Sequence, residues 1–488
     1  MLSSSLFSAS DFTSSKEVMQ ILRGAKKMIP HAKRMRYNQA IKFVGKLLLQ
    51  FKESSSRTAG SFETAAGYLG LPYKVIQGTK ETSLKKKEAP LDDLITRYGQ
   101  GYRMYITRTT VEGEARYLAE MMQRIGKGIS VLNGGDGENE HITQALLDLL
   151  TIWLRLGRLK NFTIGIVGDL KLGRTVHSLI QLLKLFTGIN VVLVPFGGLN
   201  LPERYRHGLN IVAEGDEDFS LLEQCDVIYL TRIQEERFVE AIDYERVKRI
   251  YVFGKEELDA CKPKVIVMHP QPINDEISVD IRFDPRVIMD EQAENGVAMR
   301  MFLIYRAATQ YRPLVIDRPD EDLIISRDEQ PAKKARHRDK LIRAIDRGTV
   351  LDHLPPEFID HIIALFHKLG VDTQPTIIPA RRVTDSKTVP GGIKDIAFMI
   401  DNFISDGAAA ILTLFAPLLT VNVLPGDGTI HKIKYRPPSN IQGVFNCPNP
   451  VCITNVDRYA RSWFVVDNGF AVCRYCERDF DMPSLLHN

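Results

Sequence analysis

Short apolar runs alternate with amphipathic stretches along the first 312 residues of the chain. Examples of the runs, each rich in β-branched residues and ending at a turn or a polar residue, are 162–169, 191–195, 227–231 and 265–270. Such runs are typical of strands buried in a parallel sheet, and the stretch 175–187 has the spacing of a helix. The pattern predicts an α/β fold with right-handed crossovers, whose ligands bind at the carboxyl ends of the strands.

The patterning changes after residue 312. Residues 313–340 are charged, interrupted by prolines and poor in periodicity, so we expect a linker there. The following stretch alternates strand-like runs at 348–353, 375–379 and 416–423 with helical patterns at 356–369 and 404–415, which predicts a small α+β domain. The expected division of the chain is 1–150, 151–312, 313–340, 341–440 and 441–488.

Composition narrows the class of protein. A chain of 488 residues is too long for one core, and 44% hydrophobic with 25% charged residues is typical of a soluble globular protein. The net charge of +4 is mild and suggests a small anionic ligand at least as readily as nucleic acid. No apolar run reaches the roughly 18 residues of a spanning helix, and the N-terminus does not resemble a secretory signal. We therefore expect a cytoplasmic protein that binds neither nucleic acid nor membrane.

Four of the six cysteines lie near the C-terminus, in the pairs Cys447/Cys452 and Cys473/Cys476. Two close pairs separated by a hairpin-sized stretch can bind one metal ion as thiolates. An iron site and a nucleic-acid-binding ribbon are alternatives, because thiolates alone do not select the metal. The arginines around the cysteines are offset by acidic residues, which favours a structural zinc ion with no open position for catalysis. Cys225 and Cys261 are expected to be ordinary semi-buried thiols.

A hydroxyl-rich segment, Ser55-Ser-Arg-Thr58, precedes a helical pattern. Backbone N–H groups at a helix N-terminus, together with hydroxyls and a guanidinium, can bind phosphate, although such clusters are usually only helix caps. Other cationic or polar residues occur at predicted loop positions. Each of them alone is better explained as a surface cation or a buried structural histidine: Arg108, His141, Gln144, Arg174 and Arg232.

Five ordered motifs point to a known family. They begin at Ser55 (Ser-Ser-Arg-Thr, with Ser-Phe-Glu-Thr from residue 61), Gly135 (Gly-Asp-Gly-Glu-Asn-Glu-His-Ile-Thr-Gln), Val167 (Val-Gly-Asp-Leu-Lys-Leu-Gly-Arg-Thr-Val-His-Ser), Leu230 (Leu-Thr-Arg-Ile-Gln) and His269 (His-Pro-Gln-Pro). Together they resemble the catalytic chain of aspartate transcarbamoylase over about residues 1–310. Arg347-Gly-Thr-Val-Leu-Asp-His353, Tyr435-Arg-Pro and the cysteine pairs resemble the regulatory chain of the same enzyme over about residues 343–488.

The resemblance implies a natural fusion of the two chains. Its catalytic part would consist of two doubly wound parallel-sheet subdomains, followed by a nucleotide-binding-like α+β domain and a zinc-ribbon-like β domain with one structural Zn²⁺. The implied reaction moves the carbamoyl group of carbamoyl phosphate to the amino group of L-aspartate, giving N-carbamoyl-L-aspartate and phosphate in pyrimidine (UMP) biosynthesis. The implied assembly is a homotrimer with shared active sites, joined into a hexamer through the zinc domains.

The family's functional residues match positions of this chain. The residues implied for carbamoyl phosphate are Ser55, Ser56, Arg57, Thr58, Arg108, His141 and Gln144, with Ser83 and Lys87 from a neighbouring subunit; those from Arg57 to Gln144 form the catalytic set. Lys87, Arg174, Arg232 and Gln234 match the aspartate-binding residues, while Glu53 and Arg237 match residues that orient the arginines. Guanidinium groups suit a dicarboxylate because they bind each carboxylate in a bidentate manner.

Some positions depart from the family pattern. Ala59, Gln271 and Ile273 stand where the family has arginine, leucine and arginine, which leaves two alternatives open: an altered amine specificity, or a weakened homologue that acts as a scaffold. In the regulatory part, Asp352, His353 and Lys434 match residues near a nucleotide effector, but Phe398 stands where a second lysine is expected. We therefore predict weak or absent feedback by CTP or ATP, in a domain that is as readily interpreted as architectural.

Overall fold

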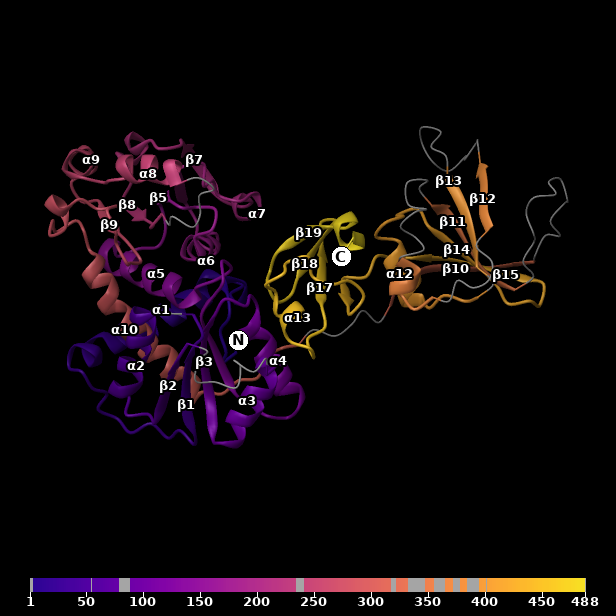
Figure 1. Cartoon of the computed structure of the whole chain (residues 1–488), viewed down its shortest axis with the longest axis horizontal. Helices are drawn as coiled ribbons and strands as arrows, with labels where there is room; N and C mark the ends of the chain where they lie inside the picture. Colours follow the sequence, from indigo (N-terminus) through magenta and orange to yellow (C-terminus); the bar gives the residue numbers. More distant parts are fainter. Residues whose placement is uncertain are drawn as a thin grey trace. The chain divides into compact units, whose positions relative to one another are not determined.

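The computed structural model describes residues 3–53, 55–78, 88–233, 241–316, 322–331, 347–354, 365–371, 378–383, 395–400 and 402–487. The chain divides into two compact units, Met1–Ile316 and Asp317–Asn488 (Figure 1). In the described part of the chain, no helix combines the length and the apolar character needed to cross a membrane.

The first unit begins with a four-stranded parallel sheet in the order β2-β1-β3-β4. Its strands are β1 (Lys46–Phe51), β2 (Tyr73–Gln77), β3 (Tyr102–Thr109) and β4 (Ser130–Asp136). The accompanying helices are α1 (Ser15–Lys33), α2 (Ser56–Tyr68), α3 (Pro90–Gly99), α4 (Glu114–Arg124) and α5 (Ile142–Leu156). The order of the strands reverses between β1 and β3, so the loops after these two strands diverge to opposite sides and leave a crevice for a ligand.

A second parallel sheet follows in the order β7-β6-β5-β8-β9. Its strands are β5 (Phe162–Gly168), β6 (Ile189–Pro195), β7 (Asn210–Glu214), β8 (Val227–Leu230) and β9 (Ile266–Met268). The helices of this part are α6 (Arg174–Leu183), α7 (Glu203–Arg206), α8 (Ala241–Ile250) and α9 (Lys255–Ala260). The apolar runs of the sequence are strands β5, β6, β8 and β9, so the predicted fold of two doubly wound sheets is confirmed. Here the order reverses between β5 and β8.

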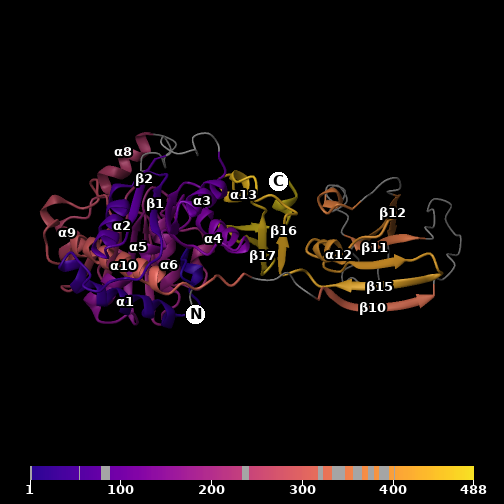
Figure 2. The same cartoon turned by 90° about the horizontal axis from the view of Figure 1, so that it is seen from below.

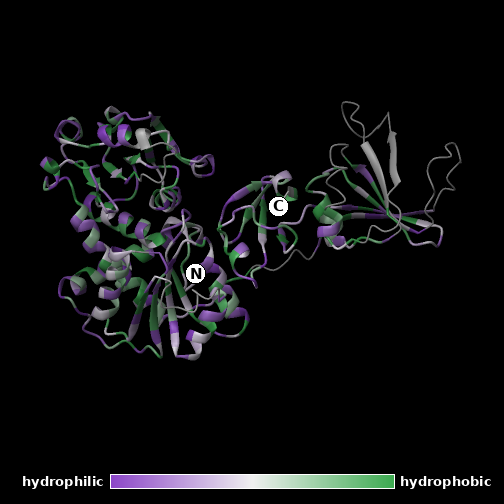
Figure 3. Cartoon of the chain, viewed as in Figure 1, coloured by the Kyte–Doolittle hydropathy of each residue, from purple (hydrophilic) through white to green (hydrophobic). Residues whose placement is uncertain are grey.

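Two long helices join the sheets. Helix α5 leads from the first sheet to the second, and α10 (Met289–Thr309) returns from the second sheet to the first (Figure 1). One continuous core cluster includes Leu146 and Leu150 of α5, Met299 of α10 and strand residues of both sheets. Helix α1, which packs on α10, buries Val18, Ile21, Leu22, Ala25 and Met28 on one side, and Figure 3 shows hydrophobic and hydrophilic residues together in the helices of this unit. Because the two sheets share one apolar core, the loops that follow their strands are held in fixed positions relative to each other.

The second unit contains a six-stranded antiparallel sheet in the order β10-β15-β14-β11-β13-β12. Its strands are β10 (Ile324–Pro331), β11 (Gly348–Leu354), β12 (Ile378–Val383), β13 (Asp395–Ile400), β14 (Thr420–Leu424) and β15 (Thr429–Tyr435), with helix α12 (Asp406–Leu412). The expected α+β domain is present. Strands β13 and β15 were not predicted, and much of the predicted helix 356–369 lies outside the described residues.

Strand β10 corrects the prediction of a linker over 313–340. Residues 324–331 pair with the whole of β15, with Ile324 opposite Tyr435 and Pro331 opposite Thr429, and Figure 2 shows the two strands side by side. The local sequence is polar and proline-flanked, so its own propensity is weak, and the hydrogen bonds offered by the edge of β15 decide its conformation. Part of the segment that joins the two units therefore belongs to the sheet.

A small β module ends the chain. It consists of β16 (Asn440–Gln442), α13 (Ile453–Val456), β17 (Trp463–Asp467), β18 (Phe470–Cys473), β19 (Asp479–Asp481) and the 3-10 helix η7 (Pro483–His487). Its strands form one antiparallel sheet in chain order. The module contacts the rest of its unit where the rings of Phe415 and Phe445 meet edge to face at 6.0 Å, and where Lys368 Nζ donates to the carbonyl of Leu486 at 3.4 Å.

Candidate active site and metal centre

The phosphate-loop residues lie at the N-terminus of α2, directly after β1. Ser55 is the N-cap, Ser56 is the first helical residue, and no side-chain cap hydrogen bond closes the end of the helix. Ser56 and Arg57 are exposed, whereas Thr58 is buried. Hydroxyls and free N–H groups therefore surround a helix end that carries partial positive charge, an arrangement suited to phosphate.

Two arginines from different subdomains meet at one carboxylate. Glu53 Oε1 accepts from Arg108 Nη2 at 3.2 Å and from Arg174 Nη2 at 2.7 Å, and Arg174 Nη1 donates to Glu53 Oε2 at 2.9 Å. Arg108 is in β3 and Arg174 begins α6. Burial opposes ionisation of Glu53, but the hydrogen bonds from Arg174 and the charges of both arginines hold its pKa below the ordinary value. One negative charge thus faces two positive charges, and the surplus favours anionic substrates.

Gly135 allows the two guanidinium groups to approach the loop after β4. A Cβ atom at this position would lie 3.3 Å from Arg108 Nη1 and 3.5 Å from Arg174 Cζ, and the φ angle of +120° is itself unfavourable for other residues. Arg108 Nη1 also lies 3.4 Å from the carbonyl of Gly134, and Arg174 Nη1 donates to that of Gly137 at 2.7 Å. A glycine is therefore required where the backbone holds both arginines.

His141 and Gln144 lie at the N-terminus of helix α5. His141 is the N-cap of α5, its Nε2 lies 3.5 Å from Thr58 Oγ1, and its backbone N–H donates to Ser178 Oγ at 2.8 Å. Burial, followed by the charges of Arg108, Arg174 and Arg300, lowers the pKa of His141 well below its ordinary value, so the imidazole is neutral. Arg108 Nε and His141 Nδ1 are buried and have no hydrogen-bond partner among the described residues. Two buried polar atoms thus remain available to a ligand.

Arg232 and His269 follow β8 and β9. Burial, with the charges of Arg232 and Arg57, lowers the pKa of His269 to about 3. Ile273 packs against the apolar core around the second sheet, and Ala59 is fully buried in the core around the first. Two of the three departures from the family pattern are therefore packing positions in this chain.

The described structure leaves some predicted residues untested. Ser83, Lys87, Gln234 and Arg237 lie outside the described residues, and so does the side chain of Phe398. The predictions for the first set, a loop from a neighbouring subunit and contacts to aspartate, remain predictions.

The predicted effector residues lie in one row across the antiparallel sheet. Asp352 of β11 is opposite Thr420 of β14, and the β14–β15 register, continued by one residue, places Lys434 opposite Thr420. Directly opposite residues point to the same face, so Asp352 and Lys434 share a face at a distance of about 10 Å, two strand spacings. The Lys434 residue is exposed, and the Asp352 side chain is 42% exposed.

His353 has a different local geometry. Its φ angle is +67°, and the register with β13 shifts between Leu351 and Leu354. Its backbone N–H donates to Asp352 Oδ1 at 3.1 Å, and its Nε2 lies 3.9 Å from Asp352 Oδ2. The strand is therefore irregular where the predicted effector residues are.

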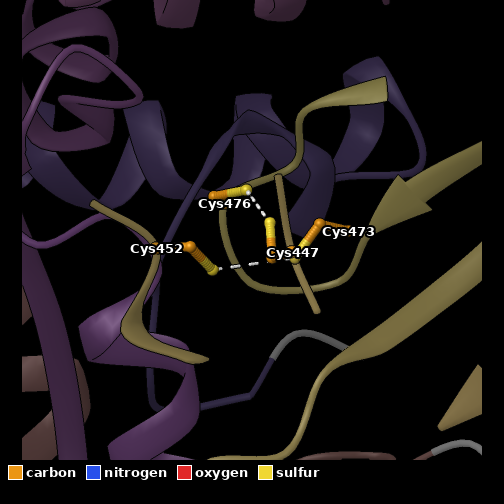
Figure 4. A group of neighbouring side chains, drawn as sticks. All are labelled: Cys447, Cys452, Cys473 and Cys476. Atoms are coloured by element: carbon orange, nitrogen blue, oxygen red, sulfur yellow. Dashed lines mark hydrogen bonds between the residues drawn. The ribbon is translucent and has the colours of Figure 1, made fainter. Parts of the chain in front are cut away.

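The four cysteines converge as predicted (Figure 4). All four sulfur atoms lie within 4.8 Å of one another, with Cys447–Cys476 and Cys452–Cys473 at 3.7 and 3.8 Å. A tetrahedral zinc ion with Zn–S bonds of about 2.3 Å requires sulfur–sulfur distances of about 3.8 Å, so the donor set fits zinc. Asn455 Nδ2 donates to the carbonyls of Cys447 and Asn449, both at 2.8 Å, and thereby fixes the first pair of cysteines. All four positions are thiolates, so the ion is structural.

Sequence reasoning missed a buried carboxylate next to the site. Asp148 is fully buried one helical turn after Gln144 and accepts a hydrogen bond from it at 2.9 Å. The signal was present in the sequence, because one acidic residue interrupts the apolar stretch Ala145-Leu-Leu-Asp-Leu-Leu150 of a helix that is otherwise hydrophobic nearly all round.

Comparison with known proteins agrees with this arrangement. Residues 5–154 match the family model "Aspartate/ornithine carbamoyltransferase, carbamoyl-P binding domain", and residues 160–307 match the Asp/Orn binding domain of the same family. Residues 340–436 match the allosteric domain and residues 439–485 the metal binding domain of the aspartate carbamoyltransferase regulatory chain.

Individual relatives cover the first unit. Aspartate carbamoyltransferase catalytic subunits of Bacteroides fragilis and Korarchaeum cryptofilum are 35% and 37% identical to the chain, over 52% and 53% of it and 82% and 86% of their own length. The catalytic subunit of the M. jannaschii enzyme has a TM-score of 0.56 at 35% identity, and the Trypanosoma cruzi enzyme in complex with carbamoyl phosphate has 0.55 at 31%. Both cover 62% of this chain, and 97% and 96% of the respective solved chain is covered.

The two sheets, with cationic side chains gathered where the order of their strands reverses, define a carbamoyltransferase fold. The chain belongs to the aspartate/ornithine carbamoyltransferase family, and it carries the catalytic domains and the regulatory domains of aspartate carbamoyltransferase in one polypeptide.

Proposed function

We propose that this protein is an aspartate carbamoyltransferase that transfers the carbamoyl group of carbamoyl phosphate to the amino group of L-aspartate, giving N-carbamoyl-L-aspartate and phosphate. The observation that carries the proposal is the shared Glu53 carboxylate, which joins Arg108 in β3 of the first subdomain to Arg174 in α6 of the second. A reaction between two anionic substrates requires cations from both subdomains at one place.

The first substrate binds at the end of α2. The backbone N–H groups and hydroxyls of Ser55, Ser56 and Thr58, with the Arg57 guanidinium, hold its phosphate. The carbamoyl carbonyl faces Thr58, Arg108 and His141. Attack by the amine creates an oxyanion, and donors fixed in advance around it lower the barrier without having to reorganise. The neutral state of His141 suits a hydrogen-bonding role and not that of a counter-charge.

The second substrate binds between the sheets. Arg174 and Arg232, with Gln234 and with Lys87 of a neighbouring subunit, hold the two carboxylates and the amine of aspartate. No covalent intermediate is needed, because two bound substrates held in contact already convert a bimolecular reaction into a unimolecular one. The phosphate that leaves accepts the proton of the amine. A site completed by Ser83 and Lys87 of a neighbour requires a trimer.

A substrate survey tests the amine specificity. Carbamoyl phosphate is offered with aspartate, ornithine or putrescine, and turnover is expected with aspartate alone, because two guanidinium groups match two carboxylates. Turnover with ornithine or putrescine and none with aspartate would overturn the proposed substrate, and Gln271 would then be the first position to examine.

The scaffold alternative makes a different prediction. A homologue that only assembles has no reason to bind a bisubstrate analogue. Titration with N-(phosphonacetyl)-L-aspartate is expected to show tight binding, since it occupies the phosphate site and the carboxylate site together. Absence of binding by a folded chain would support the scaffold.

The second unit is proposed to organise the assembly. The zinc module joins catalytic trimers into a hexamer, and the antiparallel sheet in front of it binds CTP or ATP weakly through Asp352, His353 and Lys434. Support comes from the match to the allosteric and metal-binding domains of the regulatory chain and from the row that Asp352 and Lys434 form on one face.

A further inference from the structure

Asp148 is a buried carboxylate that joins three elements. Its Oδ1 accepts from Gln144 Nε2 at 2.9 Å and from Gln292 Nε2 at 2.7 Å, and its Oδ2 accepts from Tyr229 OH at 2.8 Å. Asp148 and Gln144 are in α5, Gln292 is in α10, and Tyr229 is in β8. The Asp148 residue has no exposed surface. Burying a carboxylate is costly, so its presence between apolar helices calls for a reason other than packing.

The hydrogen bonds fix the orientation of both glutamine amides. The backbone N–H of His269, which can only donate, lies 3.0 Å from Gln292 Oε1. The other end of this amide, Nε2, must therefore be the group that faces Asp148, and Asp148 Oδ1 must be an acceptor. An acceptor at that point attracts the N–H₂ end of Gln144 and repels its carbonyl. Gln144 Oε1 is consequently left as the end of the side chain that can serve a ligand.

The same network extends to the loop after β9. Gln292 ties Asp148 to the backbone of His269, and His269 Nδ1 in turn accepts from the backbone N–H of Gln271 at 2.9 Å. This assigns the proton of the neutral imidazole to Nε2, which is buried and finds no acceptor in the described part of the chain. Asp148 thus determines which end of the Gln144 amide is left for a ligand. Through Gln292 it also supports the loop after β9.

We infer that Asp148 is a positioning residue that makes the site select a carbamoyl group, by holding Gln144 with its carbonyl oxygen towards the carbamoyl N–H₂. The inference rests on the proposed function, because Gln144 is there a ligand of carbamoyl phosphate. A carbamoyl group differs from an acetyl group in having N–H donors in place of a methyl group. Only a site that presents an acceptor can distinguish the two.

The experiment compares three phosphates on the complete chain: the KM of carbamoyl phosphate, and the inhibition constants of acetyl phosphate and inorganic phosphate. The wild-type protein is expected to prefer carbamoyl phosphate over acetyl phosphate. In Asp148→Ala this preference should fall about fivefold, the worth of one hydrogen bond, while inhibition by inorganic phosphate stays unchanged. Asp148→Asn should recover most of the preference, because its Oδ1 can accept from both glutamines while its Nδ2 donates to Tyr229.

Thr151→Ala is the matched control. Thr151 lies one turn further along α5, is fully buried and accepts from Asn295 of α10 at 3.1 Å, but it has no hydrogen bond to Gln144. The Thr151→Ala variant should be less stable, and its preference for carbamoyl phosphate over acetyl phosphate should be unchanged. If Asp148→Ala does not fold, Asp148→Leu fills the volume without an acceptor and should show the same loss.

The outcomes separate the two levels of the argument. A wild-type chain that does not turn over carbamoyl phosphate with aspartate overturns the proposed function. A wild-type chain that does, together with an Asp148→Ala or Asp148→Leu variant whose preference for carbamoyl over acetyl phosphate is unchanged, overturns the role of Asp148 and leaves a purely structural link between helices.

Discussion

The two units hold their important polar groups by different means. In the first unit, side chains from different elements bind one another: the Arg108 and Arg174 side chains are 12% and 15% exposed and share Glu53. In the second unit, four cysteines depend on a metal ion, and the predicted effector residues Asp352 and Lys434 lie on an accessible face, two strand spacings apart. The arginine pair is held in place by the protein's own carboxylate before a ligand arrives, whereas the cysteine cluster depends on the metal ion that it binds.

Metal removal should give the largest effect, because a structural zinc ion contributes on the order of 10 kcal/mol to folding. Treatment with a thiol-reactive mercurial is expected to unfold the β module and to break the assembly into active trimers, with each chain intact. The chain has two tryptophans, Trp463 in this module and Trp153 in α5. In a Trp153→Phe variant, fluorescence should therefore report the module alone.

Sedimentation and the rate of carbamoyl transfer complete that experiment. The mass is expected to fall while the rate per active site persists. An unchanged mass after complete loss of the metal would contradict the docking role of the module, and loss of activity in step with the metal would show that the two units are not independent.

Arg108→Ala should give the next largest effect. Loss of one fixed donor to the oxyanion is expected to reduce kcat by about 10²–10³-fold. The matched control is Arg155→Ala, since Arg155 pairs with Glu291 at a half-exposed position of α5 and such pairs contribute little. Steady-state rates at saturating substrates distinguish the two variants. Equal rates would show that Arg108 has no role in the chemical step.

Glu53→Gln should weaken aspartate binding. The substitution removes the charge that holds Arg174 and Arg108 in place, so the KM of aspartate should rise about tenfold, within the range of a charge-assisted hydrogen bond. Glu291→Gln is the control for loss of one carboxylate. If the KM of aspartate falls instead, Glu53 competes with the substrate for Arg174 and does not orient it.

The predicted effector site should respond on a scale comparable to that of Glu53. The expected lysine is replaced by Phe398, which weakens binding of a nucleoside triphosphate by about 1–3 kcal/mol. Phe398→Lys is expected to strengthen CTP binding in isothermal titration, and Lys434→Ala to abolish what remains. Micromolar CTP binding by the wild-type chain, with a changed aspartate saturation curve, would contradict the prediction of weak feedback.

The smallest expected effect concerns the protonation of His141. Burial and three nearby guanidinium groups keep His141 neutral, so its NMR signals should not titrate between about pH 6 and pH 8 in the folded protein. In urea the same signals should titrate near the ordinary value of about 6.5. Because the unfolded chain binds this proton more readily, the contribution of His141 to stability falls as the pH drops below about 6.5.

The same contrast explains what the sequence revealed. Apolar periodicity predicts the strands β5, β6, β8 and β9, and the spacing of the four cysteines predicts a metal site. Both signals are local in the sequence. The pairing of β10 with β15 joins residues 98 to 111 positions apart, and Asp148 and Gln292 are 144 positions apart. No local pattern carries such information, so the linker prediction was too long and the buried carboxylate was overlooked.

Strand β10 also limits how far the two units can separate. Residues 310–323 lie between α10 and β10, but Arg312 and Leu314 are hydrogen-bonded to Ser4 and Gln123 of the first unit, so the remaining residues 315–323 span at most about 35 Å when fully extended. Confinement to such a radius corresponds to an effective concentration in the millimolar range. Dilution cannot remove a regulatory unit from its own catalytic unit, so the ratio of the two stays at one to one whatever the level of expression.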